Sequence, residues 1–174
     1  MSIETITQKA TYLTFVLEQE QYAINVNKVK EILELTTITK VPRTPEYMRG
    51  VINLRGNVVP VIDLKFKLGM NRTEETSNTC IIVMEITIDE GEIIVVGALA
   101  DLVQEVIELE PGQIDPVPKI GIKLDTEFIL GMGKKDEHFI IILDIDNIFT
   151  KKELAEIGTK NISQQENKEA AEEQ

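Results

Sequence analysis

Few side chains in this sequence have the type and spacing that catalysis or metal binding requires. The chain has one histidine, His138, and one cysteine, Cys80, whereas a zinc site takes about four nitrogen or sulfur ligands. Cys80 begins an apolar run, which predicts a buried and inert thiol, and His138 follows two acidic residues, which predicts a solvated turn. Gly50 and Gly56 lack the Lys-Ser/Thr pair of a phosphate-binding loop. The residues therefore predict a protein with no catalytic site, no metal and no cofactor.

Arg55 is the charged residue that stands out by its position. It lies at a tight turn between two apolar strands, in the run G50-V-I-N-L-R-G-N-V-V-P-V-I-D-L64, so its guanidinium N–H donors are expected to face outward. One interpretation is a solvated turn arginine, or one paired with a carboxylate of the same chain such as Glu31. The other is an anchor for a partner's carboxylate or backbone carbonyls. Glu31 recurs as Glu105, so its charge is equally compatible with a structural role and with binding.

The chain repeats itself, and the repeat indicates how these residues are positioned. A shift of 74 residues aligns V29-K-E-I-L-E-L35 with V103-Q-E-V-I-E-L109, and a shift of 81 aligns V61-I-D-L64 with I142-L-D-I145. The segment between the last two blocks differs: N53-L-R-G-N57 in the first copy becomes K134-K-D-E-H138 in the second. Two related halves with one divergent hairpin predict a shared scaffold in which one copy carries a specialised surface.

Composition and charge set the class of protein. The 174 residues carry a formal net charge of −12, a field that repels phosphate backbones and anionic membranes. We therefore expect no nucleic-acid binding and no membrane insertion. The longest apolar or glycine stretch is about eight residues, far below the roughly 20 that span a bilayer, and the N-terminus lacks the apolar segment of a signal peptide. These features predict a cytoplasmic protein.

Alternating apolar and polar residues predict a mainly β fold. The expected strands are 12–17, 22–26, 35–38, 50–54, 58–64, 79–88, 93–99, 105–109, 128–133 and 138–143, and the expected short helices are 27–33, 63–69, 144–149 and 152–157. Asp63 and Asp144 follow apolar strands in both copies and are expected to cap short helices. About five strands in each copy are too few for two sandwiches and suit two small closed barrels.

The predicted domain covers residues 1–157. It consists of two intertwined halves, about 10–72 and 79–150, with a helical end to 157. Residues 158–174 are rich in Gln, Asn, Glu and Lys, a composition typical of a disordered tail.

The run M48-R-G-V-I-N-L-R-G-N-V-V-P-V-I-D-L64 closely resembles the signature of the CheW-like domain family of bacterial chemotaxis. Supporting stretches are Y22-A-I-N-V-N-K-V-K-E-I32, residues 106–118 and residues 126–133, and the resemblance covers about residues 10–155. Such domains also occur in the kinase CheA and in CheV. This chain lacks kinase, phosphotransfer and receiver segments, so the resemblance favours a stand-alone adaptor.

The resemblance implies two interlocked five-stranded Src-homology-3-like barrels around a shared core, without catalytic activity. The implied partners are the cytoplasmic tip of methyl-accepting chemoreceptors and the regulatory domain of CheA, at membrane-associated receptor arrays. We expect a monomer when the protein is free. The residues that stand at family functional positions are Val29, Glu31, Gly50 and Arg55, with Val103 as a candidate for the receptor groove.

Three questions stay open on the sequence. Val29 and Val103 are either groove residues or ordinary core, since two copies of one scaffold share core positions. The partner kinase is either CheA or a CheA-like kinase of a non-flagellar pathway. A small-molecule binder that uses the cleft between the barrels is the alternative outside the adaptor class.

Overall fold

A computed structural model describes residues 8–88, 91–117, 128–150 and 152–157. The predicted disordered tail, residues 158–174, lies outside the described residues, as do residue 118 and residues 126–127 of the stretches that support the family resemblance. Within the described ranges, no helix has both the length and the apolar character needed to cross a membrane.

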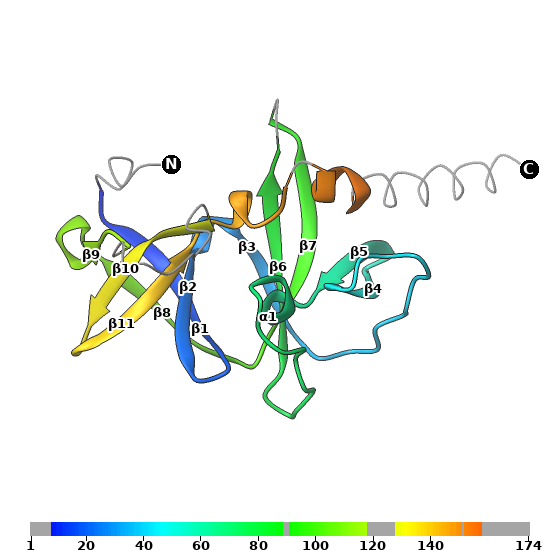
Figure 1. Ribbon diagram of the computed structural model, residues 1–174, viewed down its shortest axis with the longest axis horizontal. Helices are drawn as coiled ribbons and strands as arrows, with labels where there is room; N and C mark the ends of the chain where they lie inside the picture. The colour runs from blue at the N-terminus through cyan, green and yellow to red at the C-terminus, as the bar shows by residue number, and fades with distance from the viewer. Residues whose placement is uncertain (1–7, 89–90, 118–127, 151, 158–174) are drawn as a thin grey trace, which may run out of the picture.

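The strands form two sheets, which lie side by side along the long axis of the molecule (Figure 1). The first sheet has the order β8-β1-β2-β11-β10-β9 and the second has the order β3-β6-β7-β5-β4. The first sheet consists of β1 (Ala10–Leu17), β2 (Glu20–Asn25), β8 (Leu102–Leu109), β9 (Ile114–Asp115), β10 (Ile129–Lys135) and β11 (His138–Leu143). The second consists of β3 (Val29–Glu34), β4 (Met48–Leu54), β5 (Asn57–Ile62), β6 (Cys80–Thr87) and β7 (Ile93–Ala100). We call them barrel 1 and barrel 2.

The two copies of the repeat exchange strands. Barrel 1 takes β1 and β2 from the first copy and the other strands from the second, while barrel 2 takes β3, β4 and β5 from the first copy and β6 and β7 from the second. The parallel pairs show the symmetry: Ala23 lies opposite Ile142, and Gly97 lies opposite Val61. These residues are related by the same 74- and 81-residue shifts. The predicted fold class, two interlocked barrels, is confirmed, with the two-residue β9 as a sixth strand of barrel 1.

The core has three parts. Each barrel has its own interior, and the exchange of strands buries a third cluster between the barrels. A small cluster around Ile107, Ile140 and Ile142 fills barrel 1, and one around Ile81, Val83 and Leu99 fills barrel 2. The largest cluster lies between them and draws on both sheets; it includes the fully buried side chains of Phe15, Leu17, Ile24, Ile82 and Ile86. Burial of apolar surface is the main favourable term in folding, so this shared cluster joins the two barrels into one unit.

Several predicted elements differ from the structure. Residues 27–33 were expected to be helical, but only the 3₁₀ turn η2 (Val26–Lys28) is, and β3 follows it. The predicted strand at 35–38 is absent, and an isolated bridge pairs Thr39 with Val51 instead. The helix at 144–149 is the shorter 3₁₀ turn η6 (Ile145–Asn147). The 3₁₀ turn η4 (Pro111–Gln113) was not expected.

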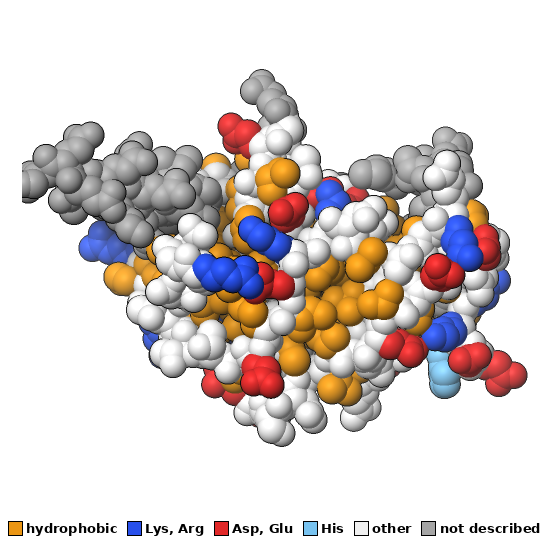
Figure 2. Space-filling model, turned by 180° about the vertical axis from the view of Figure 1, so that it is seen from behind, with side chains coloured by type: hydrophobic (Ala, Val, Ile, Leu, Met, Phe, Trp, Pro, Cys, Tyr) orange, Lys and Arg blue, Asp and Glu red, His pale blue; other side chains and the backbone are white. Residues whose placement is uncertain are grey.

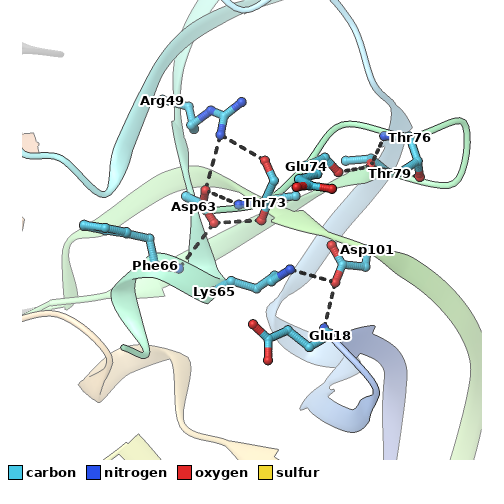
Figure 3. Close-up of polar contacts among 10 residues, drawn as sticks. All are labelled: Glu18, Arg49, Asp63, Lys65, Phe66, Thr73, Glu74, Thr76, Thr79 and Asp101. Carbon is cyan, nitrogen blue, oxygen red and sulfur yellow. Dashed lines mark hydrogen bonds and ion pairs between the residues drawn. The ribbon is translucent and has the colours of Figure 1, made fainter. Parts of the chain in front are cut away.

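The predicted capping roles of the two aspartates are confirmed, and one of them does more. Asp63 caps α1 (Leu64–Lys67) and Asp144 caps η6, each accepting a hydrogen bond from a backbone N–H of its helix. Asp63 is also fully buried, and it accepts from the N–H and hydroxyl of Thr73 at 2.9 and 2.8 Å and pairs with Arg49 (Figure 3). A buried carboxylate needs such partners. Asp63 therefore fixes the loop between β5 and β6 against barrel 2.

Candidate partner-binding surface

Arg55 and Glu31 form an ion pair across the open seam of barrel 2. The Arg55 Nη1 atom lies 2.9 Å and Nη2 lies 3.3 Å from the two carboxylate oxygens of Glu31. The paired geometry is that of a bidentate guanidinium–carboxylate contact. Strands β3 and β4 are the two ends of the sheet order, so this contact joins them. Of the two sequence interpretations of Arg55, its pairing with Glu31 is what the structure contains.

The Arg55 side chain nevertheless stays available to a partner. Its side chain is 73% exposed while that of Glu31 is 20% exposed. Glu31 therefore holds the guanidinium on one side, and the remaining N–H donors face solvent. A guanidinium in this position is pre-oriented for an incoming carboxylate or carbonyl.

Barrel 1 closes its seam in the same way with different residues. Lys135 Nζ lies 2.9 Å from a carboxylate oxygen of Glu105, the residue equivalent to Glu31. Lys135 aligns with Leu54, and Asp136 aligns with Arg55. The cation has thus moved by one residue, and the turn position has reversed its charge. The two hairpins therefore differ in the charge that the turn exposes to solvent. The ion pair that closes the seam is present in both barrels.

The β4–β5 turn has positive φ angles at both of its central residues, Arg55 (52°) and Gly56 (85°). The equivalent Asp136 (49°) and Glu137 (66°) do the same. Two-residue hairpin loops of this twist require positive φ at both central residues, and this local requirement outweighs the mild strain at Arg55.

Val29 and Val103 lie at the junction of the two barrels. Val29 is the first residue of β3 and pairs with Met84, and Val103 is the second residue of the equivalent strand β8 and pairs with Phe15. Both side chains are partly buried and pack against the cluster that the barrels share. They are thus neither fully buried core nor free surface. This placement fits the groove interpretation, and their role in binding stays a prediction.

Two further apolar side chains lie on the same strand faces as these valines. Ile32 on β3 is 44% exposed and pairs with Ile82, and Val106 on β8 is 56% exposed and pairs with Leu13, both partners belonging to the shared cluster. Strands β3 and β8 lie on the rear side in Figure 1, and the view from behind shows hydrophobic side chains gathered between the two barrels with charged groups around them (Figure 2). We call the surface formed by Val29, Ile32, Val103 and Val106 the apolar groove.

Sequence reasoning overlooked the groove residues Ile32 and Val106, although a signal for them existed. Each follows its strand's valine by three residues, and the two are related by the 74-residue shift. A spacing of three residues fits a helix face, whereas in a strand it puts two side chains on one face only where a bulge intervenes, as it does in both strand pairs. Since an exposed apolar patch marks an interaction site, its recurrence in both copies was the available clue.

Gly50 lies apart from both sets of residues and has a backbone role. Its φ is +143°, and a Cβ built there would lie 2.1 Å from the Thr39 carbonyl oxygen. Thr39 and Val51 exchange backbone hydrogen bonds of 2.9 and 2.8 Å at this point. Gly50 is buried, so it supports the β4 edge that carries Arg55.

The two residues with chemical potential have ordinary surroundings. His138 is exposed in the β10–β11 hairpin. Cys80 was expected to be buried, but it is half-buried because it stands at the start of β6, with its thiol donating to the Asn78 carbonyl. In the ranges that the structure covers, no group of three or more His, Cys, Asp or Glu residues is placed to hold a metal ion.

Comparison with known proteins places this architecture in a family. The model of the CheW-like domain matches residues 11–153. A chemotaxis protein CheW of Klebsiella aerogenes is 36% identical over 87% of this chain and 87% of its own length, and that of Bacillus subtilis is 34% identical over 80% and 86%. The crystal structure of the scaffolding protein TtCheW from Thermoanaerobacter tengcongensis superimposes with a TM-score of 0.72 at 35% identity, covering 83% of this chain and 90% of that one. None of these names is that of an enzyme. With a match across both barrels and relatives of nearly the same length, this chain belongs to the CheW-like domain family, whose members here are non-enzymatic chemotaxis proteins.

Proposed function

We propose that this chain is an adaptor that couples methyl-accepting chemoreceptors to the histidine kinase CheA. The observation that carries the proposal is the apolar groove, where each of the equivalent strands β3 and β8 packs a valine, Val29 or Val103, against the shared cluster and carries a more exposed apolar residue, Ile32 or Val106, three positions later. An amphipathic helix binds by laying its apolar face into such a groove. The helical-hairpin tip of a chemoreceptor has this form, and the names of the relatives support chemotaxis as the setting.

The kinase contact is assigned to the seam of barrel 2. Arg55 is pre-oriented by Glu31 on a turn that differs in charge from its equivalent in barrel 1. The β4–β5 turn of barrel 2 is basic at this position, and the equivalent β10–β11 turn of barrel 1 is acidic. The two ends of the adaptor therefore carry different charges. A homologous regulatory domain of CheA would meet the Arg55 end through loop and strand-edge contacts. The adaptor then works in the cytoplasm, recruited to membrane-associated receptor arrays.

Co-sedimentation of the purified protein with receptor cytoplasmic fragments and CheA tests the proposal. We expect the protein to pellet with assembled receptor fragments alone, and CheA to join the pellet only when the protein is added. Absence of the protein from the receptor pellet, at concentrations where CheA is active, would refute the receptor assignment. Binding to receptors without recruitment of CheA would refute the coupling.

Arg55→Ala is expected to weaken binding of the kinase regulatory domain without unfolding the protein. A surface turn residue costs at most about 0.5 kcal/mol of stability, whereas a central interface arginine contributes about 2 kcal/mol or more to binding. Thermal melting and titration of both partners measure the two quantities. The matched control is Lys135→Ala, which removes the equivalent seam contact from barrel 1. Equal losses from both variants would assign Arg55 to seam closure alone, and unchanged binding to kinase and receptor would remove it from the binding surface.

A further inference from the structure

Among the ion pairs of the described residues, two link a helical turn of one barrel to a crossover between the barrels. In the first, Lys65 Nζ lies 3.2 Å from Asp101 Oδ2, and the same oxygen accepts the Glu18 N–H at 2.7 Å (Figure 3). Lys65 belongs to α1 of barrel 2, Glu18 to the β1–β2 turn of barrel 1, and Asp101 to the crossover between them. We call this set the first latch. The Lys65 side chain is only 10% exposed, so the contact is not a solvated surface pair.

The second latch has the same plan at the position related by the repeat. Lys28 Nζ lies 2.7 Å from Asp146 Oδ2, and Asp146 Oδ1 accepts the Thr87 N–H at 2.8 Å. Asp146, in η6 of barrel 1, is the 81-residue equivalent of Lys65. Lys28 stands at the crossover from β2 to β3, and Thr87 ends β6 of barrel 2. Each latch thus joins a helical turn of one barrel, a hairpin of the other and the crossover between the barrels.

The charges of the two latches are reversed. The helical turn supplies the cation in the first and the anion in the second, and the crossover supplies the opposite charge each time. In both, one carboxylate receives an ammonium group and a hairpin N–H. The contact between the barrels recurs in both copies, but the residue types that form it differ. A recurring contact with reversed charges indicates that the bridge itself has a role, because shared ancestry of the side chains cannot account for it.

The latches stand directly beside the apolar groove. Lys28 precedes Val29, and Asp101 precedes Val103 by two residues, so each latch fixes the start of a strand that carries a groove valine. Barrels joined only by an apolar cluster have no directional contact to set their relative angle, because apolar contacts are non-directional. Hydrogen-bonded ion pairs are directional. We infer that Lys28, Asp146, Lys65 and Asp101 are positioning residues that set the angle between the barrels and thereby the separation of the two walls of the groove; for receptor binding, this rests on the proposed function.

The test measures the separation of the barrels directly and needs no partner. Spin labels at Glu34→Cys and Glu108→Cys, in a Cys80→Ser background, report the distance between equivalent exposed positions of β3 and β8. Labels at Glu20→Cys and Glu108→Cys report a distance within barrel 1. We expect Lys28→Met to broaden the first distance distribution and leave the second unchanged. The control Lys134→Met, which removes the Lys134–Asp115 pair within barrel 1, should change neither.

Rescue by charge exchange separates positioning from simple stability. Lys28→Asp combined with Asp146→Lys copies the polarity of the first latch, and it should restore the narrow distribution that each single variant loses. Affinity for receptor fragments should fall about five- to tenfold in Lys28→Met, in proportion to the fraction of molecules with a competent groove, and recover in the exchanged pair.

An unchanged distance distribution in folded Lys28→Met and Lys65→Met, or an exchanged pair whose distance distribution stays broad, would overturn the inference. A wild-type protein that binds no receptor fragment would refute the proposed function, while the distances would still decide whether the latches position the barrels.

Discussion

Val29→Asp is expected to abolish binding to receptor fragments and to leave the protein folded. Val29 is partly buried at the start of β3, where its side chain borders the shared core and still reaches solvent. In the free protein a carboxylate at this edge can turn toward water. Against the apolar face of a receptor helix it would be desolvated without a partner, which costs several kcal/mol, on the order of 2–4. Receptor pull-down with circular dichroism measures both results.

Two variants make this result interpretable. Ile93→Asp introduces the same charge at an apolar position that is 57% exposed on β7, outside the groove, and it should bind receptor like the wild type. Ile32→Asp introduces the charge at a more exposed groove position than Val29, so its fold is at less risk. A protein that unfolds in Val29→Asp and binds normally in Ile32→Asp would show that these side chains serve the core, and the groove assignment would then be wrong.

The repeat made the architecture predictable. Equal spacing of apolar residues, of Asp63 and Asp144 and of the two valines indicated two copies of one unit, and the structure places those residues at equivalent positions. Short strands joined by polar turns are local features, so most strands were predicted within a few residues. The identification of two barrels followed because five strands per copy cannot cover their own apolar faces in a sandwich.

The errors arose where pairing partners decide the structure. Val29, Ile32 and Leu33 have a spacing that fits a helix, but a bulge between Val29 and Glu31 lets this segment pair with β6 as a strand. Alternation alone does not reveal a bulge, because the extra residue changes the phase of the pattern. The choice between strand and helix was therefore made by β6, about 50 residues away along the chain.

The sequence alone did not predict the latches, and it left the Arg55–Glu31 pair as one of two interpretations. The reason is again that residues far apart along the chain form these contacts. Lys65 and Asp101 are 36 residues apart, and Lys28 and Asp146 are 118 residues apart. Only the exchange of strands between barrels brings these charges together. Their reversed polarity also hides them from a search for repeated residue types, since the two copies carry opposite charges at the equivalent sites Lys65 and Asp146.

Gly50→Ala is expected to destabilise the protein by at least about 3 kcal/mol, through the backbone alone. The new Cβ would lie 2.1 Å from the Thr39 carbonyl oxygen and 2.9 Å from Ile38 Cγ2, at a φ of +143° that L-residues rarely adopt. The Thr39 oxygen belongs to the bridge with Val51, so it cannot move without breaking that pair. Because this bridge and the Arg55–Glu31 contact close the same seam, the β4 edge should loosen as well.

Gly56→Ala is the matched control, because it separates conformational strain from the clash. Gly56 also has a positive φ, 85°, but its Cβ would meet no atom within 4 Å, so the change should cost only about 1–2 kcal/mol. Urea denaturation gives both free energies of unfolding, and titration with CheA and receptor fragments at low temperature gives the binding of the folded fraction. We expect folded Gly50→Ala to keep most of its affinity, because a buried glycine has no side chain to offer a partner. A Gly50→Ala protein with wild-type stability and no partner binding would show instead that Gly50 contacts the partner directly.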